Sequence, residues 1–207
     1  PSINRFLLIF AVGIFMGFIS LLWMRRIPGG EGTQEFDAHI GLRAYARAAG
    51  DRRYLVFLMI TTFALSGMVW FGASYVMYLR DHLAVQDSMT MTLTSLGGLG
   101  ILLTVGSWAR FTEVGGSGLA MAKTLLGHTI APVLLFLAGT GLPGQQWMAA
   151  AAVTLACIFS AAFGVAINRA MLNQVPDHDR IGYTALWTVS TSLAHGITPV
   201  LAGLLIE

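Results

Sequence analysis

The sequence predicts an all-α protein, a polytopic bundle of membrane-spanning helices, and three observations support this prediction. Of the 207 residues, 56% are hydrophobic and only 11% are charged, whereas a soluble domain has about 25% charged residues. The hydrophobic residues gather in runs long enough to cross a bilayer core of roughly 30 Å as helices. The carboxylates lie between these runs or at their ends. With a net charge of only +2, this composition excludes an ordinary soluble enzyme, a disordered chain and a nucleic-acid-binding protein.

Six apolar runs mark the expected helices. They cover residues 6–24, 54–78, 89–108, 119–138, 147–167 and 182–206. The first run is not a cleavable signal peptide, because Arg25 and Arg26 follow it and no small-residue cleavage site is present. We therefore expect residues 1–24 to form one membrane helix, residues 25–53 a cytoplasmic linker, and residues 54–207 a transmembrane bundle of five helices.

The linker, residues 25–53, is the one long polar stretch of the sequence. After a Pro-Gly-Gly turn, Phe36, Ile40 and Ala46 recur at helical spacing, which is typical of a short amphipathic helix on a membrane surface. A solvated linker without regular structure is the alternative, and the sequence favours neither.

The basic residues predict which way the helices face. Ten of the twelve Lys and Arg residues fall in one set of segments, and only Arg5 and Arg80 fall in the other. Lys and Arg beside short loops are retained on the cytoplasmic side. We therefore expect a plasma-membrane protein with both chain ends outside and with the loops near Gly41, Thr112 and Pro176 in the cytoplasm.

The last run divides into a polar and an apolar side at about 100° per residue. The polar side carries Thr184, Thr188, Thr191, His195 and Thr198, and the opposite side carries Leu186, Val189, Leu193, Ile197 and Val200. Threonine hydroxyls in membrane helices often bond to carbonyls of their own helix, so this pattern has a purely structural explanation. The imidazole of His195 in the middle of the polar side favours a water-accessible face instead.

We expect no catalytic residue, no metal and no cofactor. The chain has no motif of a known hydrolase or phosphate-binding loop, and its single cysteine, Cys157, excludes an internal disulfide or a cysteine metal cage. His128 and His195 are the two histidines near the middle of the predicted membrane helices. A haem or metal held between them is the less favoured interpretation, and we expect His128 to be a packed, hydrogen-bonded core residue.

The layout and two short motifs resemble the major facilitator superfamily, from the end of its sixth helix through its eleventh. The loop 173–183 reads Asn-Gln-Val-Pro-Asp-His-Asp-Arg-Ile-Gly-Tyr and precedes a helix containing Gly196, Pro199 and Gly203. The segment Gly106-Ser-Trp-Ala-Arg110-Phe stands where the family often has Gly-x-x-x-Asp-Arg-x-Gly, and there only Gly106 matches.

The resemblance implies a major-facilitator-like bundle, namely an incomplete C-terminal half plus one helix of the N-terminal half. The chain would then be a fragment that needs the missing helices of its own protein. It also implies a secondary carrier in the lipid bilayer that moves a small solute by alternating access. The runs 54–78, 89–108, 147–167 and 182–206 would line the cavity, and the other two would be peripheral.

Two sets of site residues follow from the resemblance. Aromatic planes and hydroxyls orient a solute without burying a net charge, so the expected solute pathway comprises Trp70, Tyr75, Thr94, Trp187, Thr188, Thr191 and His195. The expected cytoplasmic gate or loop residues are Gly106, Arg110, Asn168, Arg169, Pro176 and Arg180.

Two other function classes stay open. The first is a non-transporting membrane subunit that serves assembly or binds a pigment, haem or lipid. The second is a membrane enzyme acting on lipids, which would need a polar cluster at one interface; Asn168, Arg169 and Asn173 are the candidates for such a cluster.

Overall fold

The structure is a computed structural model that describes Phe15 and residues 38–176 and 180–206. The chain divides into two compact units, Pro1–Ala38 and His39–Glu207. The boundary between them falls inside the segment 25–53 that was predicted as a linker. The expected membrane helix 6–24 lies outside the described residues, apart from Phe15, which is helical and exposed.

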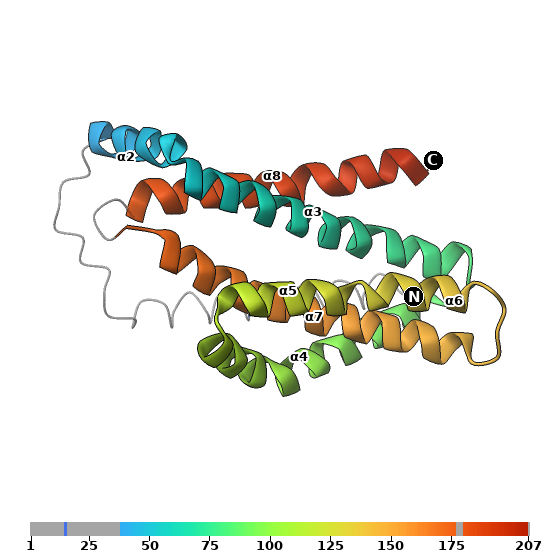
Figure 1. Cartoon of the computed structure of the whole chain (residues 1–207). Coiled ribbons are helices and arrows are strands. Elements are labelled where there is room, and N and C mark those ends of the chain that lie inside the picture. The colour runs from blue at the N-terminus through green and yellow to red at the C-terminus, as the bar shows by residue number, and fades with distance from the viewer. Residues whose placement is uncertain (1–14, 16–37, 177–179, 207) are drawn as a thin grey trace. The chain divides into compact units, whose positions relative to one another are not determined.

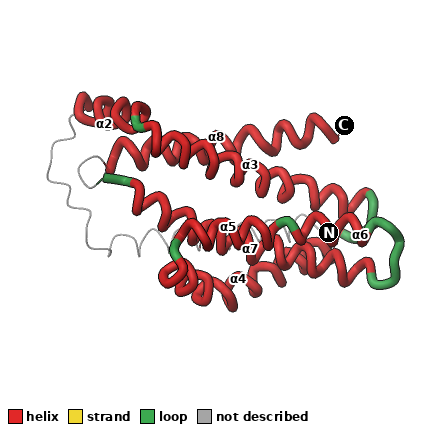
Figure 2. Tube along the Cα trace, in the orientation of Figure 1, coloured by secondary structure: helices red, strands yellow, loops and turns green. Residues whose placement is uncertain are grey.

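The second unit is built from helices, and no strand occurs among the described residues (Figure 2). The elements are α2 (Ala38–Gly50), α3 (Arg52–Asp81), α4 (Asp87–Gly115), α5 (Ser117–His128), α6 (Ile130–Ala138), α7 (Gln145–Gln174) and α8 (Arg180–Ile206). Five spans, with α5 and α6 counted as one, are long and apolar enough to cross a membrane. This confirms the five helices expected after residue 54, although α4 continues past the predicted end at Trp108 to Gly115.

Glycine and proline explain two of the helix ends. Gly116 separates α4 from α5 with φ of 83°, a left-handed conformation that glycine adopts without steric cost. Pro132 has no N–H to donate to the carbonyl of His128 and its ring crowds that carbonyl. The run 119–138, predicted as one continuous helix, is accordingly interrupted at Thr129.

Helix α7 forms the centre of one group of helices and packs on α4, α5 and α6 (Figure 1). Its contact surface is made of small side chains such as Ala149, Ala152 and Ala156, all of which are buried. A Cβ atom at Gly97 of α4 would lie 2.6 Å from the Sγ of Cys157. Such close approach of helix backbones through small residues is typical of membrane bundles.

Helices α3 and α8 form a second pair, joined to α2 and α7 by a cluster of larger side chains. Tyr54, Phe163, Ile167 and Trp187 are its main members, and each is at least nine-tenths buried. The pair runs alongside the α7 group, and the α2–α3 and α4–α5 connections, the end of α7 and the start of α8 lie at one end (Figure 1). The sequence predicts that the connections between these helices lie on a common side.

The described surface is strongly apolar. Phe63 and Leu103 are each 83% exposed, and Phe136 is 72% exposed, while alanines fill much of the interior. Soluble proteins rarely expose contiguous apolar patches of this kind. The surface and the helix lengths are therefore consistent with a membrane protein.

Residues 38–50 of the linker form helix α2, so the helical alternative holds for this part. Ala44 and Ala48 are its buried residues, while Ala46 is exposed. Gly182 of α8 lies against α2, since a Cβ at this position would overlap the backbone of Ala44. Helix α2 therefore meets the start of α8 at a close contact between backbones.

Candidate functional site

Helix α8, with its Thr and His residues, has three sides that differ in exposure. The polar residues Thr184, Thr188 and His195 are exposed on one side, and Leu193, Ile197 and Val200 are 52–62% exposed on another. Between them lies a buried seam. Leu186, expected on the apolar side, and Thr198, expected on the polar side, both belong to this seam, with exposures of 8% and 6%.

The hydroxyl groups of the polar side bond to their own helix. Thr188 Oγ1 donates to the carbonyl of Thr184 at 2.9 Å, and Thr191 Oγ1 donates to that of Trp187 at 3.0 Å. These bonds satisfy the hydroxyls without any partner outside the helix. The purely structural explanation of the threonine pattern therefore accounts for the hydroxyls.

His195 is different, because only one of its two ring nitrogens bonds to the helix. Its Nδ1 lies 2.8 Å from the carbonyl oxygen of Thr191. Since a carbonyl can only accept, the neutral ring carries its proton on Nδ1, and Nε2 is left as a hydrogen-bond acceptor. The exposed side of α8 thus presents one polar atom that its own helix does not satisfy.

The two tryptophans of the predicted pathway lie away from His195. Trp187 is buried, and its ring stacks on Phe57 of α3 with 5.9 Å between centroids. Trp70 lines a groove of about 620 Å³ between α3 and α8, on the side of Leu193 and Ile197. Trp70 therefore shares its groove with Thr198 but not with Thr188 or His195.

Tyr75 and Thr94, predicted from separate runs, do meet. The Tyr75 hydroxyl lies 3.5 Å from Thr94 Oγ1 and so joins α3 to α4. The ring of Phe71 lies beside Tyr75 at 5.7 Å and contacts the His128 ring edge-on at 5.4 Å. The structure thus places an aromatic and polar cluster between α3, α4 and α5.

His128 is a packed core residue, as expected, with an exposure of 8%. Its Nδ1 lies 3.5 Å from Ser160 Oγ of α7, while its Nε2 has no hydrogen-bond partner among the described residues. The ring sits where α5 ends, one turn before Pro132. Helical periodicity does not predict which neighbours the two ring nitrogens would meet.

The predicted gate residues lie at the end of the bundle where α4 meets α5 and α7 leads to α8. Arg169 of α7 pairs with Glu113 of α4 at 3.3 Å, and both side chains are largely exposed. Gly106, Arg110 and Asn168 are exposed too, Pro176 is half-buried, and Arg180 begins α8. The ion pair links Arg169, a member of this set, to α4.

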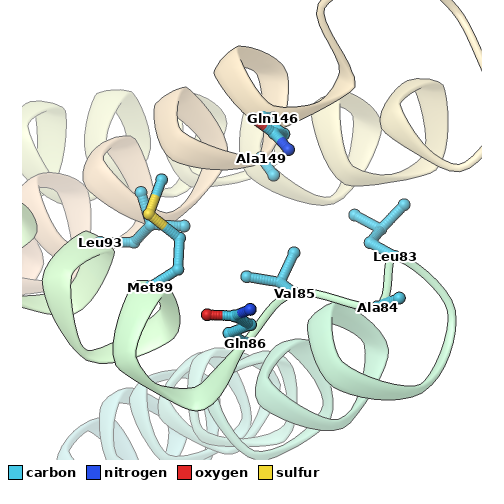
Figure 3. Close-up of a pocket in the computed structure, with 8 residues that line it drawn as sticks. All are labelled: Leu83, Ala84, Val85, Gln86, Met89, Leu93, Gln146 and Ala149. Atoms are coloured by element: carbon cyan, nitrogen blue, oxygen red, sulfur yellow. The ribbon is translucent and has the colours of Figure 1, made fainter.

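A cavity of about 310 Å³ lies at the opposite end, and no sequence pattern predicted it (Figure 3). It is enclosed by the α3–α4 turn, the start of α4 and the start of α7. Figure 3 shows its lining residues, which are Leu83, Ala84, Val85, Gln86, Met89, Leu93, Gln146 and Ala149. The amides of Gln86 and Gln146 among apolar side chains suit an uncharged group that forms hydrogen bonds.

A hydrogen-bond network at the α2–α3–α8 junction was also missed. Asp51 Oδ1 caps α3 by accepting from the backbone N–H groups of Arg53 and Tyr54 at 2.9 and 3.2 Å. Asp51 Oδ2 accepts from the Tyr183 hydroxyl at 3.0 Å, and the Tyr54 hydroxyl donates to the Tyr183 carbonyl at 2.7 Å. The bonds from the Tyr54 N–H and the Tyr183 hydroxyl hold the pKa of Asp51 below its usual value of 3.8. An Asp just before an apolar run signals a helix cap, but its bond to α8 has no local signal.

Fold and composition together define an all-helical protein with five described spans capable of crossing a membrane. Comparison with family models, with curated proteins and with solved structures finds no match to this chain.

Proposed function

We propose that the protein is a secondary carrier of the plasma membrane that moves a small solute by alternating access, as the resemblance to the major facilitator superfamily implies. The observation that carries the proposal is the exposed polar side of α8, where the Nε2 of His195 has no partner in its own helix. In hydrocarbon such an atom is costly, so polar groups in membrane helices face water or protein. A water-filled pathway supplies that partner.

The proposed pathway uses residues whose positions suit different tasks. Thr188, Thr191 and His195 follow one another along α8 and present the polar side to the solute. Tyr75 and Thr94 extend polar contact onto α3 and α4 through their 3.5 Å approach. Trp70 and Trp187, which lie away from this side, keep only supporting roles in packing α3 against α8.

The described spans favour a neutral or anionic solute over a strongly cationic one. Within the described spans, carboxylates occur only near helix ends, at Asp81, Asp87 and Glu113. A cationic solute would find no counter-ion between them. At the proposed cytoplasmic end, the exposed pair of Arg169 and Glu113 is a contact that a rocking motion can break at small cost.

Exchanging the two sides of α8 tests the proposal. Cells expressing the intact reading frame are assayed for uptake of a panel of labelled neutral and anionic small solutes. For a solute taken up, Thr191→Leu should lower uptake roughly tenfold or more, because a polar contact in the pathway is lost. Leu193→Thr should have little effect, since Leu193 is 54% exposed on the apolar side.

The opposite order, with Leu193→Thr the more harmful change, contradicts the assignment of the pathway to this side. No uptake of any solute by the unmodified protein, at normal expression in the membrane, contradicts the carrier function itself.

A further inference from the structure

We propose that arginines around the junction of α2 and α3 bind the headgroup of an anionic phospholipid, with its acyl chains lying along α3. The arginine cluster consists of Arg43 on α2 and of Arg52 and Arg53 in the first turn of α3, all exposed. Arg47 and Arg180 lie nearby and are engaged in interactions of their own. The proposal rests on the proposed membrane orientation but not on transport.

The junction holds the arginine cluster in place. Helix α2 is fixed by the buried Ala44 and Ala48 and by the close contact of Ala44 with Gly182 of α8. Asp51 joins α2 to α3 and is itself held by Tyr183 at 3.0 Å. The arginines therefore project from helices whose backbones meet at this junction, and the conformational freedom lost when they bind a ligand is mainly that of their own side chains.

Charge at the junction favours an anion. Asp51, the carboxylate between α2 and α3, already accepts hydrogen bonds from two backbone N–H groups and one hydroxyl. The first turn of α3 contains no acid. Together with the Tyr54 N–H and the Tyr183 hydroxyl, Arg53 contributes to holding the pKa of Asp51 below its usual value, so this carboxylate is already partnered and three arginines stand against one acid at the junction.

The surface below the arginines identifies the anion as a lipid. Val56, Met59, Ile60 and Phe63 follow Arg52 at helical spacing on one side of α3, with exposures of 50%, 72%, 61% and 83%. A cationic end above an apolar stripe matches a phospholipid, whose headgroup is anionic and whose chains are apolar.

Lipid retention by the purified full chain tests the site. Native mass spectrometry compares phosphatidylglycerol with phosphatidylcholine of the same acyl chains. The unmodified protein should retain phosphatidylglycerol preferentially. In the triple variant Arg43→Gln/Arg52→Gln/Arg53→Gln, affinity for it should fall about fivefold for each charge removed, while phosphatidylcholine retention should not change.

Two matched variants serve as controls. The triple Arg→Lys variant at the same positions keeps the charge and should keep most of the preference. Arg80→Gln, at the other end of α3 and paired with Asp81 at 2.9 Å, should leave retention unchanged.

Equal retention of both lipids by the unmodified protein, or an unchanged preference in the glutamine variant, would overturn the proposal. So would displacement of phosphatidylglycerol by equimolar inorganic phosphate, because the site would then not need the acyl chains. None of these readouts involves transport, so failure of the lipid site and failure of the carrier function are distinguishable.

Discussion

At the scale of single residues, Asp51 shows how one side chain can fix several helices. It caps α3 through two backbone N–H groups and reaches α8 through the Tyr183 hydroxyl. Loss of an N-cap side chain typically costs about 1 kcal/mol. The same carboxylate therefore supports both the start of a helix and the contact between two helices distant in sequence.

Replacing Asp51 by alanine should destabilise the protein by about 1 kcal/mol or more at neutral pH. Because the pKa of Asp51 in the folded protein lies below 3.8, its contribution is complete above that pH and is lost as the pH falls through the folded-state value. The difference in Tm between the unmodified protein and Asp51→Ala, measured in detergent, should therefore shrink on acidification below pH 3.8. A difference that stays constant down to full protonation would show that the charge of Asp51 does not matter.

His195 and His128 also show what residue-scale reasoning can and cannot reach. The sequence places both rings near the middle of a helix, and periodicity assigns His195 to a polar side. Which ring nitrogen is bonded depends on the backbone nearby: His195 bonds to Thr191 at 2.8 Å, and His128 keeps a buried Nε2 without a described partner. Spacing alone does not contain that information.

At the scale of helices, the contact between α2 and α8 depends on a missing side chain. Gly182 lets the start of α8 approach the backbone of Ala44, and any Cβ there would overlap it. Close packing of this kind is steeply sensitive to added atoms, because backbone cannot move aside as a flexible side chain can.

Gly182→Ala should therefore lower stability by roughly 1–3 kcal/mol. Gly196→Ala in the same helix is the matched control, because a Cβ there meets nothing within 4 Å and alanine is the better helix former by up to about 1 kcal/mol. Thermal unfolding of the two variants in detergent should shift in opposite directions. If both variants behaved alike, the α2–α8 contact would not contribute to stability.

Hydrophobic runs predicted the number of helices after residue 54 and their order, because length and apolarity are local properties. They did not predict the interruption at Thr129. The signal, Pro132, is present in the sequence, but Pro199 lies inside α8 without ending it. Whether a proline breaks a helix depends on the packing around it. The sequence of one apolar run does not show which helices will pack against that run.

For the candidate site, too, the sequence predicted what depends on periodicity within one helix and missed what depends on contacts between helices. Helical periodicity places Thr188 and Leu193 on different sides of α8, and the structure keeps them apart. Periodicity did not predict that Trp187 stacks on Phe57 or that Trp70 shares a groove with Leu193 and Thr198. It also missed the network of Asp51, Tyr54 and Tyr183, since their contacts span about 130 positions of sequence and have no periodic signature.

At the scale of the whole molecule, the described unit is apolar outside, and inside it small residues line the contacts of α7 with α4 while larger side chains fill the space between α3 and α8. In that surface the polar side of α8 is an exception, with Thr184, Thr188 and His195 exposed together. The likeness to the major facilitator superfamily stays a prediction, and the proposed carrier depends on water reaching this side. All the proposed pathway residues depend on water reaching the polar side of α8.

Labelling by a membrane-impermeant thiol reagent measures the water accessibility of the polar side of α8 most directly. In a Cys157→Ala background of the intact protein in native membranes, single cysteines replace Thr188, His195 and Leu193. The account predicts that positions 188 and 195 react and that solute present during labelling slows them, while position 193 stays unreactive. Reaction at position 193, with positions 188 and 195 protected as if surrounded by acyl chains, would contradict it.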